Sequence, residues 1–260
     1  MSARWGRPLV RLGVCASTNE VARWLAAAGL PEGTAVIAQI QTRGRGRHGR
    51  IWSSPAGGLW CSLLLRPAAQ TAWGRLSLAA SVATAEAIER TANVRAAIRW
   101  PNDVLVEGRK VAGILLEAAA HAVIAGIGIN ANVATADLPP VVRGRAGSLH
   151  ELSGHAISLE TLFETLRERF ARWYALWSSS TDAAVEDIIE GWSARDATRG
   201  QQRGIQIGSQ RVEGIAEGVD ATGALRVRAR DGLVRTVTAG DIVSPPVLAG
   251  GDGRIGYGDI

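Results

Sequence analysis

The stretch AAIRWPNDVLVEGRKVAGILLEAAAHAVIAGIGIN, residues 96–130, decides the fold. Its apolar segments at 96–100, 103–108, 110–118 and 121–130 are short and rich in Val and Ile, which is typical of β-strands. Parallel neighbours in a sheet need a crossover of a dozen or more residues, whereas these segments follow one another almost without a gap. We therefore expect antiparallel pairing, with PN and EGR at the turns.

Helix and strand patterns continue on the N-terminal side of this stretch. Ser17 and Glu20 have the spacing of a capping box, which predicts a helix over 21–28. The other expected elements on this side are a strand at 34–40, a Gly-rich loop at 41–58, a strand at 59–66 and a helix at 76–91. The fold class is then α+β, with a mixed or antiparallel central sheet and flanking helices.

The C-terminal side of the chain predicts two helices and then a separate small domain. Segments 158–177 and 183–192 are helical in pattern, and the aromatic residues of the first are expected in the core. After them, short Val- and Ile-bearing strands broken by Gly and Asp indicate a small SH3-like β-barrel. We expect a catalytic domain over 1–198, the barrel over 199–247 and a flexible tail over 248–260.

The composition is that of a globular protein: of 260 residues, 47% are hydrophobic and 20% are charged. No apolar run approaches the roughly 18 residues of a membrane span, and no signal-peptide core is visible, so we expect a cytoplasmic protein without a membrane partner. A net charge of +5 favours anionic partners but only weakly indicates nucleic acid. Cys15 and Cys61 are too few for a disulfide framework or a thiolate metal site.

Lys110 is the single lysine among 29 Lys and Arg residues. One interpretation is that coding bias replaced the other lysines and this one survived by chance. The other is that its site needs a compact, strongly hydrated ammonium, for which a planar guanidinium is no substitute. The residue alone leaves both interpretations open.

The Gly/Arg loop, which we define as residues 43–50, reads RGRGRHGR. Its glycines let the backbone approach a ligand closely, and its arginines supply charge for phosphate or carboxylate oxygens. A nucleic-acid patch that binds by charge alone is the alternative. A long Gly-rich loop between two strands is more typical of an active-site lid, and the chain contains no Walker A motif.

Two motif-like segments do not fit the sites that they suggest. GIGINA at 126–131 matches a dinucleotide fingerprint in its letters, but prolines soon afterwards prevent the long helix that such a fingerprint must open. His150 and His155 are five residues apart with a glycine between them, so they cannot share the helical face of a zinc protease. We interpret them as loop and surface histidines.

Asn102 and Asp103 lie on a turn one hairpin away from Lys110. Such a turn is ordinary in itself. Together with the lone lysine and the Gly/Arg loop, it indicates phosphate chemistry outside the common P-loop scheme, and nucleotidyl transfer fits that description.

These segments together resemble the biotin protein ligase family. The resemblance rests on STN at 17–19, QTRGRGRHGRIW at 41–52, RWPND at 99–103, KVAGIL at 110–115 and GIGIN at 126–130, which occur in the family's order and spacing. With the small C-terminal barrel, the resemblance covers most of the chain, from about residue 15 to residue 245.

The resemblance implies a two-step reaction. The carboxylate of biotin attacks the α-phosphate of ATP, accompanied by Mg²⁺, to give biotinyl-5′-AMP and pyrophosphate. A lysine on the biotin carboxyl carrier domain of a biotin-dependent carboxylase then takes the biotinyl group. Closure of the Gly/Arg loop over the adenylate keeps water away from the mixed anhydride.

The resemblance also implies residue roles. The catalytic residues are Lys110, Arg47 and Arg45. The biotin-binding residues are Ser17, Thr18, Asn19, Gln41, Gly44, Arg45, Gly46, Arg47, Lys110 and Gly113. The ATP-binding residues are Arg47, Arg50, Trp52, Asn102 and Asn130, and Asp103 is a weak candidate for Mg²⁺ that arrives with ATP.

The sequence departs from the family pattern in places. Arg99 stands where the family usually has lysine, and Arg43 makes the loop more basic. Only 16 residues precede Ser17, so we expect a monofunctional ligase without the DNA-binding domain and without specific DNA binding. A homodimer through an exposed sheet edge stays open. The remaining alternatives are a lipoate or octanoate ligase, a nucleic-acid-binding module and a covalent lysyl-adenylating ligase.

Overall fold

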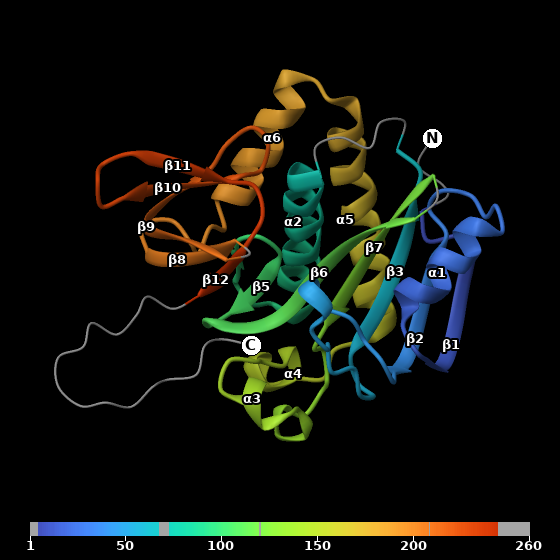
Figure 1. The fold of residues 1–260 in the computed structure, drawn as a ribbon. Coiled ribbons are helices and arrows are strands. Elements are labelled where there is room, and N and C mark those ends of the chain that lie inside the picture. The colour runs from blue at the N-terminus through green and yellow to red at the C-terminus, as the bar shows by residue number, and fades with distance from the viewer. Residues whose placement is uncertain (1–4, 68–72, 120, 208, 244–260) are drawn as a thin grey trace.

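The computed structural model describes residues 5–67, 73–119, 121–207 and 209–243. They form a seven-stranded mixed sheet flanked by helices and a five-stranded antiparallel C-terminal sheet beside it (Figure 1). The expected α+β fold class is confirmed. None of the helices in these residues is long and apolar enough to cross a membrane.

The central sheet has the strand order β1-β2-β3-β7-β6-β5-β4. Only β1 and β2 pair in parallel, and every other neighbouring pair is antiparallel. Among the antiparallel pairs are those between β4 and β7, for which the short connections predicted this pairing. The strands are β1 (Leu9–Cys15), β2 (Ala35–Gln41), β3 (Leu59–Leu65), β4 (Ala96–Arg99), β5 (Asp103–Val106), β6 (Arg109–Ala119) and β7 (Ala122–Ile129).

Two local features at the N-terminus differ from the sequence-based expectation. The edge strand β1 was not expected. Helix α1 (Thr18–Ala27) begins earlier than the predicted start at residue 21, directly after Ser17. The Ser17 side chain makes no capping hydrogen bond, so the predicted capping box is wrong in its mechanism. Ser17 is instead buried at the wall of the pocket described below.

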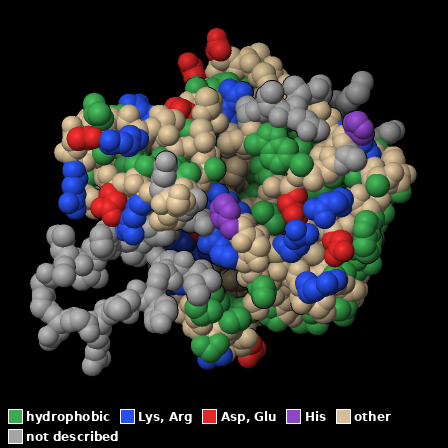
Figure 2. All heavy atoms as spheres, viewed as in Figure 1, with side chains coloured by type: hydrophobic (Ala, Val, Ile, Leu, Met, Phe, Trp, Pro, Cys, Tyr) green, Lys and Arg blue, Asp and Glu red, His purple; other side chains and the backbone are tan. Residues whose placement is uncertain are grey.

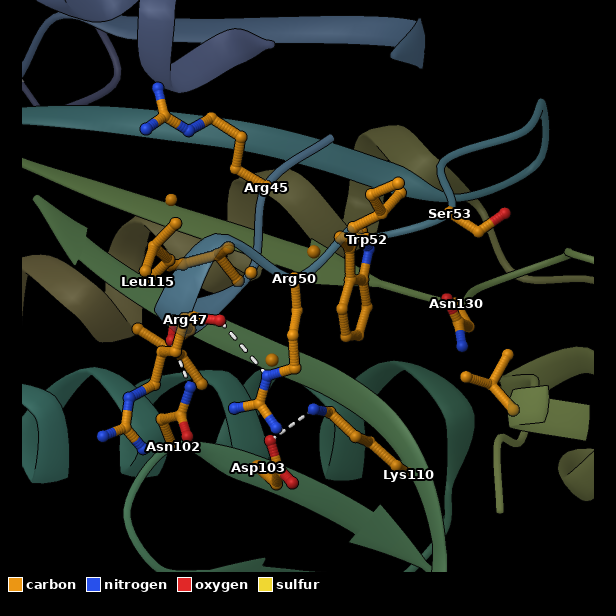
Figure 3. A pocket seen from close by; sticks show the side chains of 18 of the residues that line it. Arg45, Arg47, Arg50, Trp52, Ser53, Asn102, Asp103, Lys110, Leu115 and Asn130 are labelled. Atoms are coloured by element: carbon orange, nitrogen blue, oxygen red, sulfur yellow. Dashed lines mark hydrogen bonds and ion pairs between the residues drawn. The ribbon is translucent and has the colours of Figure 1, made fainter. Parts of the chain in front are cut away.

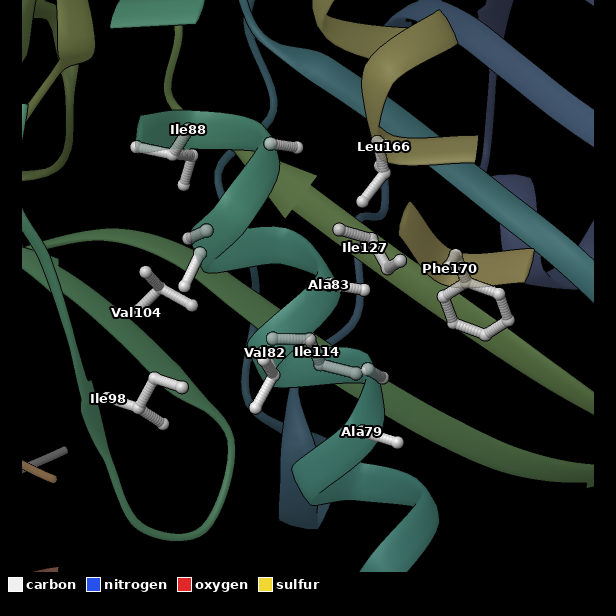
Figure 4. Close-up of a cluster of buried hydrophobic side chains, with 14 of the residues drawn as sticks. Ala79, Val82, Ala83, Ile88, Ile98, Val104, Ile114, Ile127, Leu166 and Phe170 are labelled. Atoms are coloured by element: carbon white, nitrogen blue, oxygen red, sulfur yellow. The ribbon is translucent and has the colours of Figure 1, made fainter. Parts of the chain in front are cut away.

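Alternating side chains of the central strands supply two apolar layers. Leu63 and Leu65 face the larger core under α2 (Trp73–Ala92) and α5 (Leu159–Ser179), whereas Leu64 faces a smaller cluster under α1. Successive side chains of a strand point to opposite faces, so a strand that is buried on both faces contributes alternately to the two layers. Figure 4 shows the larger core, in which α2 packs against β6, β7 and α5 through Ala79, Val82, Ala83, Ile114, Ile127, Leu166 and Phe170.

The remaining helices are short or cover the edge of the larger core. The aromatic residues of α5 are buried in that core, as expected. The other helices are α3 (Pro140–Arg143), α4 (Leu149–Ser153) and α6 (Asp182–Ser193), with single 3-10 turns at η1 (Arg47–Gly49) and η2 (Thr135–Asp137).

The C-terminal sheet has the strand order β11-β10-β9-β8-β12, and all its pairs are antiparallel. Its strands are β8 (Gln202–Ile207), β9 (Gln210–Val219), β10 (Leu225–Ala229), β11 (Val234–Val237) and β12 (Asp241–Val243). The predicted tail at 248–260 lies outside the described residues, and the domain boundary at 198/199 stays a prediction.

A glycine contact joins the C-terminal sheet to the first turn of α2. Gly223 has φ +85°, and a Cβ on it would lie 2.5 Å from the carbonyl carbon of Gly74. Trp100, which follows β4, donates its indole N–H to the carbonyl of Gly223 at 3.2 Å. The close backbone approach therefore fixes the C-terminal sheet against α2 and the residue that follows β4.

We expect Gly223→Ala to lower the free energy of unfolding by about 3 kcal/mol, because an alanine there adds a backbone clash to the cost of a left-handed conformation. Gly218→Ala is the matched control: Gly218 has φ +107°, but nothing lies within 4 Å of its Cβ position. The control should lose only about 1–2 kcal/mol in urea unfolding. Equal losses in the two variants would show that the contact does not hold the two units together.

Candidate active site

One pocket collects nearly all the residues singled out in the sequence. Its volume is ≈ 330 Å³, and it is lined by the Gly/Arg loop, the central strands and two residues of the C-terminal sheet. Figure 2 shows Lys and Arg side chains near the middle of the face seen there, between the C-terminal sheet and the rest of the molecule. The predicted residues that line the pocket are Ser17, Thr18, Asn19, Gln41, Arg45, Gly46, Arg47, Arg50, Trp52, Asn102, Asp103, Lys110, Gly113 and Asn130.

Gly44 is the exception, because it does not line the pocket. A Cβ at Gly44 would lie 2.3 Å from the carbonyl oxygen of Trp52 and 2.6 Å from the hydroxyl of Ser54. The glycine is therefore needed where the two ends of the loop approach each other. The predicted contact between Gly44 and biotin stays a prediction.

One end of the pocket is a preorganised polar network. The Ser62 hydroxyl lies 2.7 Å from Thr18 Oγ1 and 2.6 Å from Asn19 Oδ1. Gln41 accepts a hydrogen bond from the Thr18 backbone N–H at 2.8 Å and donates to Ser54 at 2.8 Å. Because these groups hold one another, they offer a ligand fixed donors and acceptors rather than mobile ones.

Glu117 anchors this end, and the sequence analysis missed it. Its carboxylate accepts from Asn19 Nδ2 at 2.7 Å and pairs with Arg23 at 3.2 Å and Arg45 at 3.3 Å. In Figure 3, Arg45 points away from Lys110, toward the opposite side of the loop. The one feature of the sequence that could have pointed to Glu117 is its position as an acidic residue at the end of the apolar segment KVAGILLE.

Lys110 lies at the centre of the pocket beside the acid that the sequence placed one hairpin away. Its Nζ is 2.5 Å from Asp103 Oδ1 and 5.0 Å from the ring centroid of Trp52, a cation–π contact (Figure 3). Arg99 pairs with the other oxygen of Asp103 at 2.8 Å. Arg99, which stands where the resembled family usually has lysine, thus keeps a positive charge beside Asp103.

Asp103 keeps its negative charge despite burial. Burial by itself raises the pKa of this carboxyl group, but the nearby Lys110 and Arg99 charges and their hydrogen bonds outweigh it, so the pKa lies below its ordinary value. The site therefore holds a carboxylate that is shared by two cations near neutral pH, which leaves a net positive charge.

The lowered pKa of Asp103 predicts a pH dependence of stability. A carboxyl group whose pKa is lower in the folded state contributes stability above its unfolded pKa of about 3.9 and loses it as the pH falls through the folded value. Between pH 5 and pH 3, we expect the free energy of unfolding to fall more steeply in the wild type than in Asp103→Asn, by up to about 1.4 kcal/mol per pH unit. Urea unfolding at several pH values measures this difference, and parallel profiles would contradict it.

The residues of the pocket do not form a resident magnesium site. Asp103 is the one acidic residue lining the described pocket, and both of its oxygens are engaged by cations. In the described part of the chain, no group of three or more His, Cys, Asp or Glu side chains is placed to hold a metal ion. A Mg²⁺ ion held mainly by phosphate oxygens and water suits this donor set better than a protein cage.

Trp52 lies on a platform of two glycines. Gly113 of β6 and Gly128 of β7 are register partners, and a Cβ on Gly128 would lie 2.6 Å from Trp52 Nε1. The indole N–H is buried without a hydrogen-bond partner among the described residues. The two glycines therefore let the ring cover the sheet between the two ends of the pocket.

The Gly/Arg loop also reaches the C-terminal sheet. Arg47 donates to the carbonyl oxygen of Gly240, just before β12, at 3.1 Å. The Arg50 side chain donates its Nε–H to the carbonyl of Arg47 at 3.2 Å (Figure 3), and the backbone N–H of Arg50 donates to the same carbonyl at 3.1 Å, which closes the single turn η1. Arg203 and Ile242 of the C-terminal sheet complete this side of the pocket, and the sequence analysis assigned them no role.

Asn130 forms the other end of the pocket, at the end of β7. Its Nδ2 donates to the carbonyl of Gly147 at 3.0 Å, while its buried Oδ1 has no partner among the described residues. Asn102 is held by a hydrogen bond from its Nδ2 to the carbonyl of Ile114 at 2.6 Å. Asn130 is thus held in place, with a buried acceptor that no described residue uses.

The structure agrees with the exclusions made from sequence. Gly126 and Gly128 lie inside β7 and do not open a helix. His150 and His155 are both exposed, although His150 lies in the short helix α4 rather than in a loop. Cys61 is buried, which raises the pKa of its thiol to about 12, and Cys15 is partly buried.

Comparisons with known proteins agree on one family. Residues 13–133 match the biotin/lipoate A/B protein ligase family, and residues 203–243 match the biotin protein ligase C-terminal domain. A biotin–(acetyl-CoA-carboxylase) ligase of Paracoccus denitrificans is 38% identical over 227 residues, covering 82% of this chain and 90% of that protein. The bifunctional ligase/repressor BirA of Bacillus spizizenii is 43% identical over 159 residues, covering 58% of this chain and 49% of that protein. The matched region thus spans about half the length of the BirA relative.

Solved structures share the fold. The biotin protein ligase of Aquifex aeolicus in complex with biotin and ATP superposes with a TM-score of 0.81 at 26% identity, over 91% of this chain and 97% of that one. Fold and pocket therefore define a protein of the biotin/lipoate ligase class. The long match to the Paracoccus ligase and the C-terminal domain match narrow this class: the chain belongs to the biotin protein ligase family.

Proposed function

We propose that this protein is an ATP-dependent biotin protein ligase. It activates biotin as biotinyl-5′-AMP and transfers the biotinyl group to a lysine of a biotin carboxyl carrier domain. The observation that carries the proposal is the position of Lys110, the single lysine of the chain, between a preformed polar network and the buried acceptor of Asn130 that no described residue uses.

The strand order supports a division of the pocket between the two substrates. Asn19 and Ser62 lie over β3 and β7, Lys110 is on β6, and Asn130 ends β7. Biotin then occupies the network end, with its carboxylate directed toward Lys110. The adenosine extends toward Asn130, whose buried Oδ1 accepts a hydrogen bond from the adenine amino group.

In the activation step, a carboxylate oxygen of biotin forms a bond to the α-phosphorus, and the bond from that phosphorus to the bridging oxygen breaks. Pyrophosphate leaves with the electron pair. Lys110 turns from Asp103 toward the non-bridging oxygens, where its charge stabilises the transition state. Arg45 and Arg47 close the Gly/Arg loop over the product, which excludes water from the mixed anhydride.

In the transfer step, the free amine of the carrier lysine attacks the carbonyl carbon of the adenylate and forms the C–N bond. The bond from that carbon to the phosphate oxygen breaks, AMP leaves with the electron pair, and the nitrogen gives its extra proton to solvent. Asp103 is the acid positioned to contact the incoming amine. An ordinary lysine is protonated at neutral pH, so the buried carboxylate can orient the ammonium group, which releases one proton to solvent before the free amine attacks. The carrier domain and a cytoplasmic location belong to this proposal, as does a homodimer through the free edge of β1.

The proposal is tested by the intact mass of a purified carboxyl carrier domain after incubation with this protein, biotin and Mg-ATP. A single biotinyl addition that requires ATP is expected. Reactions without ATP, and with lipoate in place of biotin, are the controls. Addition of lipoate alone would replace the proposal by lipoate chemistry, and no addition by a folded protein would remove the ligase assignment.

A further inference from the structure

Arg203 brings a cation from the C-terminal sheet into the pocket. It lies on β8, and its Nε is buried without a hydrogen-bond partner among the described residues. Burial, followed by the charge of the nearby Arg99, lowers the pKa of its guanidinium below the ordinary value, although an arginine stays protonated. Two like charges thus lie close together, and one of them has an unused buried donor.

The pocket as a whole has far more positive than negative charge. Its lining cations in the described structure are Arg45, Arg47, Arg50, Arg99, Lys110, Arg145 and Arg203, and Asp103 is its one lining acid, while Arg45 also pairs with Glu117 beside the pocket. Asp103 is already shared by Lys110 and Arg99, so it cannot also compensate Arg203. A ligand with several negative charges on adjacent groups would compensate this excess.

The strand order indicates which part of the ligand reaches Arg203. Crossing the sheet from β3 to β4 leads from Asn19 past Lys110 on β6 to Arg99 at the end of β4. In an in-line displacement, the leaving group lies opposite the attacking oxygen. If biotin attacks from the β3 side at Lys110, the leaving phosphates point toward β4 and therefore toward Arg99 and Arg203.

We propose that Arg203, together with Arg99, binds the terminal phosphates of ATP and the pyrophosphate that leaves. This inference rests on the proposed ligase function and gives the C-terminal sheet a part in the activation step alone. The Gly74–Gly223 contact and the hydrogen bond from Trp100 hold that sheet in place, so Arg203 is positioned before the nucleotide arrives. Biotinyl-5′-AMP has no terminal phosphates, and the transfer step should not need Arg203.

The experiment compares Arg203→Gln with wild type in both half-reactions. In biotin-dependent ATP–pyrophosphate exchange, the KM for ATP and the inhibition constant for pyrophosphate should each rise about tenfold or more. The KM for biotin and the transfer from preformed biotinyl-5′-AMP to the carrier domain should stay within twofold. Arg226→Gln is the matched control, because Arg226 is on the same sheet but half-exposed beside Glu217.

Each other outcome decides against the proposal or against its premise. Unchanged constants for ATP and pyrophosphate would overturn the role of Arg203, and an equal loss in the transfer step would assign it to the carrier domain or to folding instead. If Arg203→Gln does not fold, Arg203→Lys decides: it should bind a non-hydrolysable biotinyl-adenylate analogue normally and ATP more weakly. A wild-type protein inactive in both half-reactions would instead refute the proposed function itself.

Discussion

Lys110→Arg is expected to slow the formation of biotinyl-5′-AMP by about 10²–10³-fold while the fold survives. The Lys110 ammonium fits between Asp103 Oδ1, 2.5 Å away, and the Trp52 ring, whose centroid is 5.0 Å away. A guanidinium keeps the charge but is planar and wider, so it cannot leave Asp103 and meet the α-phosphate in the same way. Biotin-dependent ATP–pyrophosphate exchange measures the effect.

The control for Lys110→Arg is a charge-conserving exchange on the surface. Arg90 is exposed in the last turn of α2, and Arg90→Lys should keep full exchange activity. Both variants should unfold at wild-type temperature, because neither removes a charge or a core side chain. Near-normal exchange by Lys110→Arg would mean that the single lysine survived by chance.

Sequence patterns predicted best those helices and strands whose apolar residues recur with one regular spacing. The short apolar segments between residues 96 and 130 have connections too short for parallel pairing, so antiparallel pairing was predicted. Strands β4 to β7 pair in that way. The aromatic residues of α5 recur at helical spacing and are buried. In both cases, burial of a regular face is a local property, so the sequence can report it.

The features that were missed depend on distant segments meeting. Strand β1 reads LVRLGVC with a largely exposed face, so no clear alternation distinguishes it from a loop. Glu117 matters because it meets Asn19, 98 residues away, and Arg203 because its sheet docks beside β4. The motifs nevertheless located most of the pocket, since their residue types reflect the ligand chemistry that the family requires.

The two glycines of β7 are expected to affect different substrates when each is replaced by alanine. A Cβ on Gly126 would lie 2.2 Å from Asn19 Oδ1, and Asn19 is held in place by Ser62 and Glu117. Gly126→Ala must therefore break a buried network at the biotin end. We expect the KM for biotin to rise about 100-fold with a much smaller change for ATP, since misplacement by about 1 Å has effects of this size.

Gly128→Ala should show the opposite pattern. Its Cβ would lie 2.6 Å from Trp52 Nε1, so the indole ring must leave the glycine platform and its contact with Lys110. The KM for ATP should rise and kcat should fall, each by about tenfold or more, while biotin binding is nearly unchanged. Steady-state kinetics with each substrate varied in turn separates the two variants.

The matched control for this pair is Gly13→Ala in β1. Gly13 is also a strand glycine, but nothing lies within 4 Å of its Cβ position, so neither substrate should be affected. The pair tests the division of the pocket itself, because Gly126 and Gly128 are two residues apart on one face of one strand. If both alanine variants raised the same KM, biotin and ATP would not be separated along β7, and the substrate assignment derived from the strand order would be wrong.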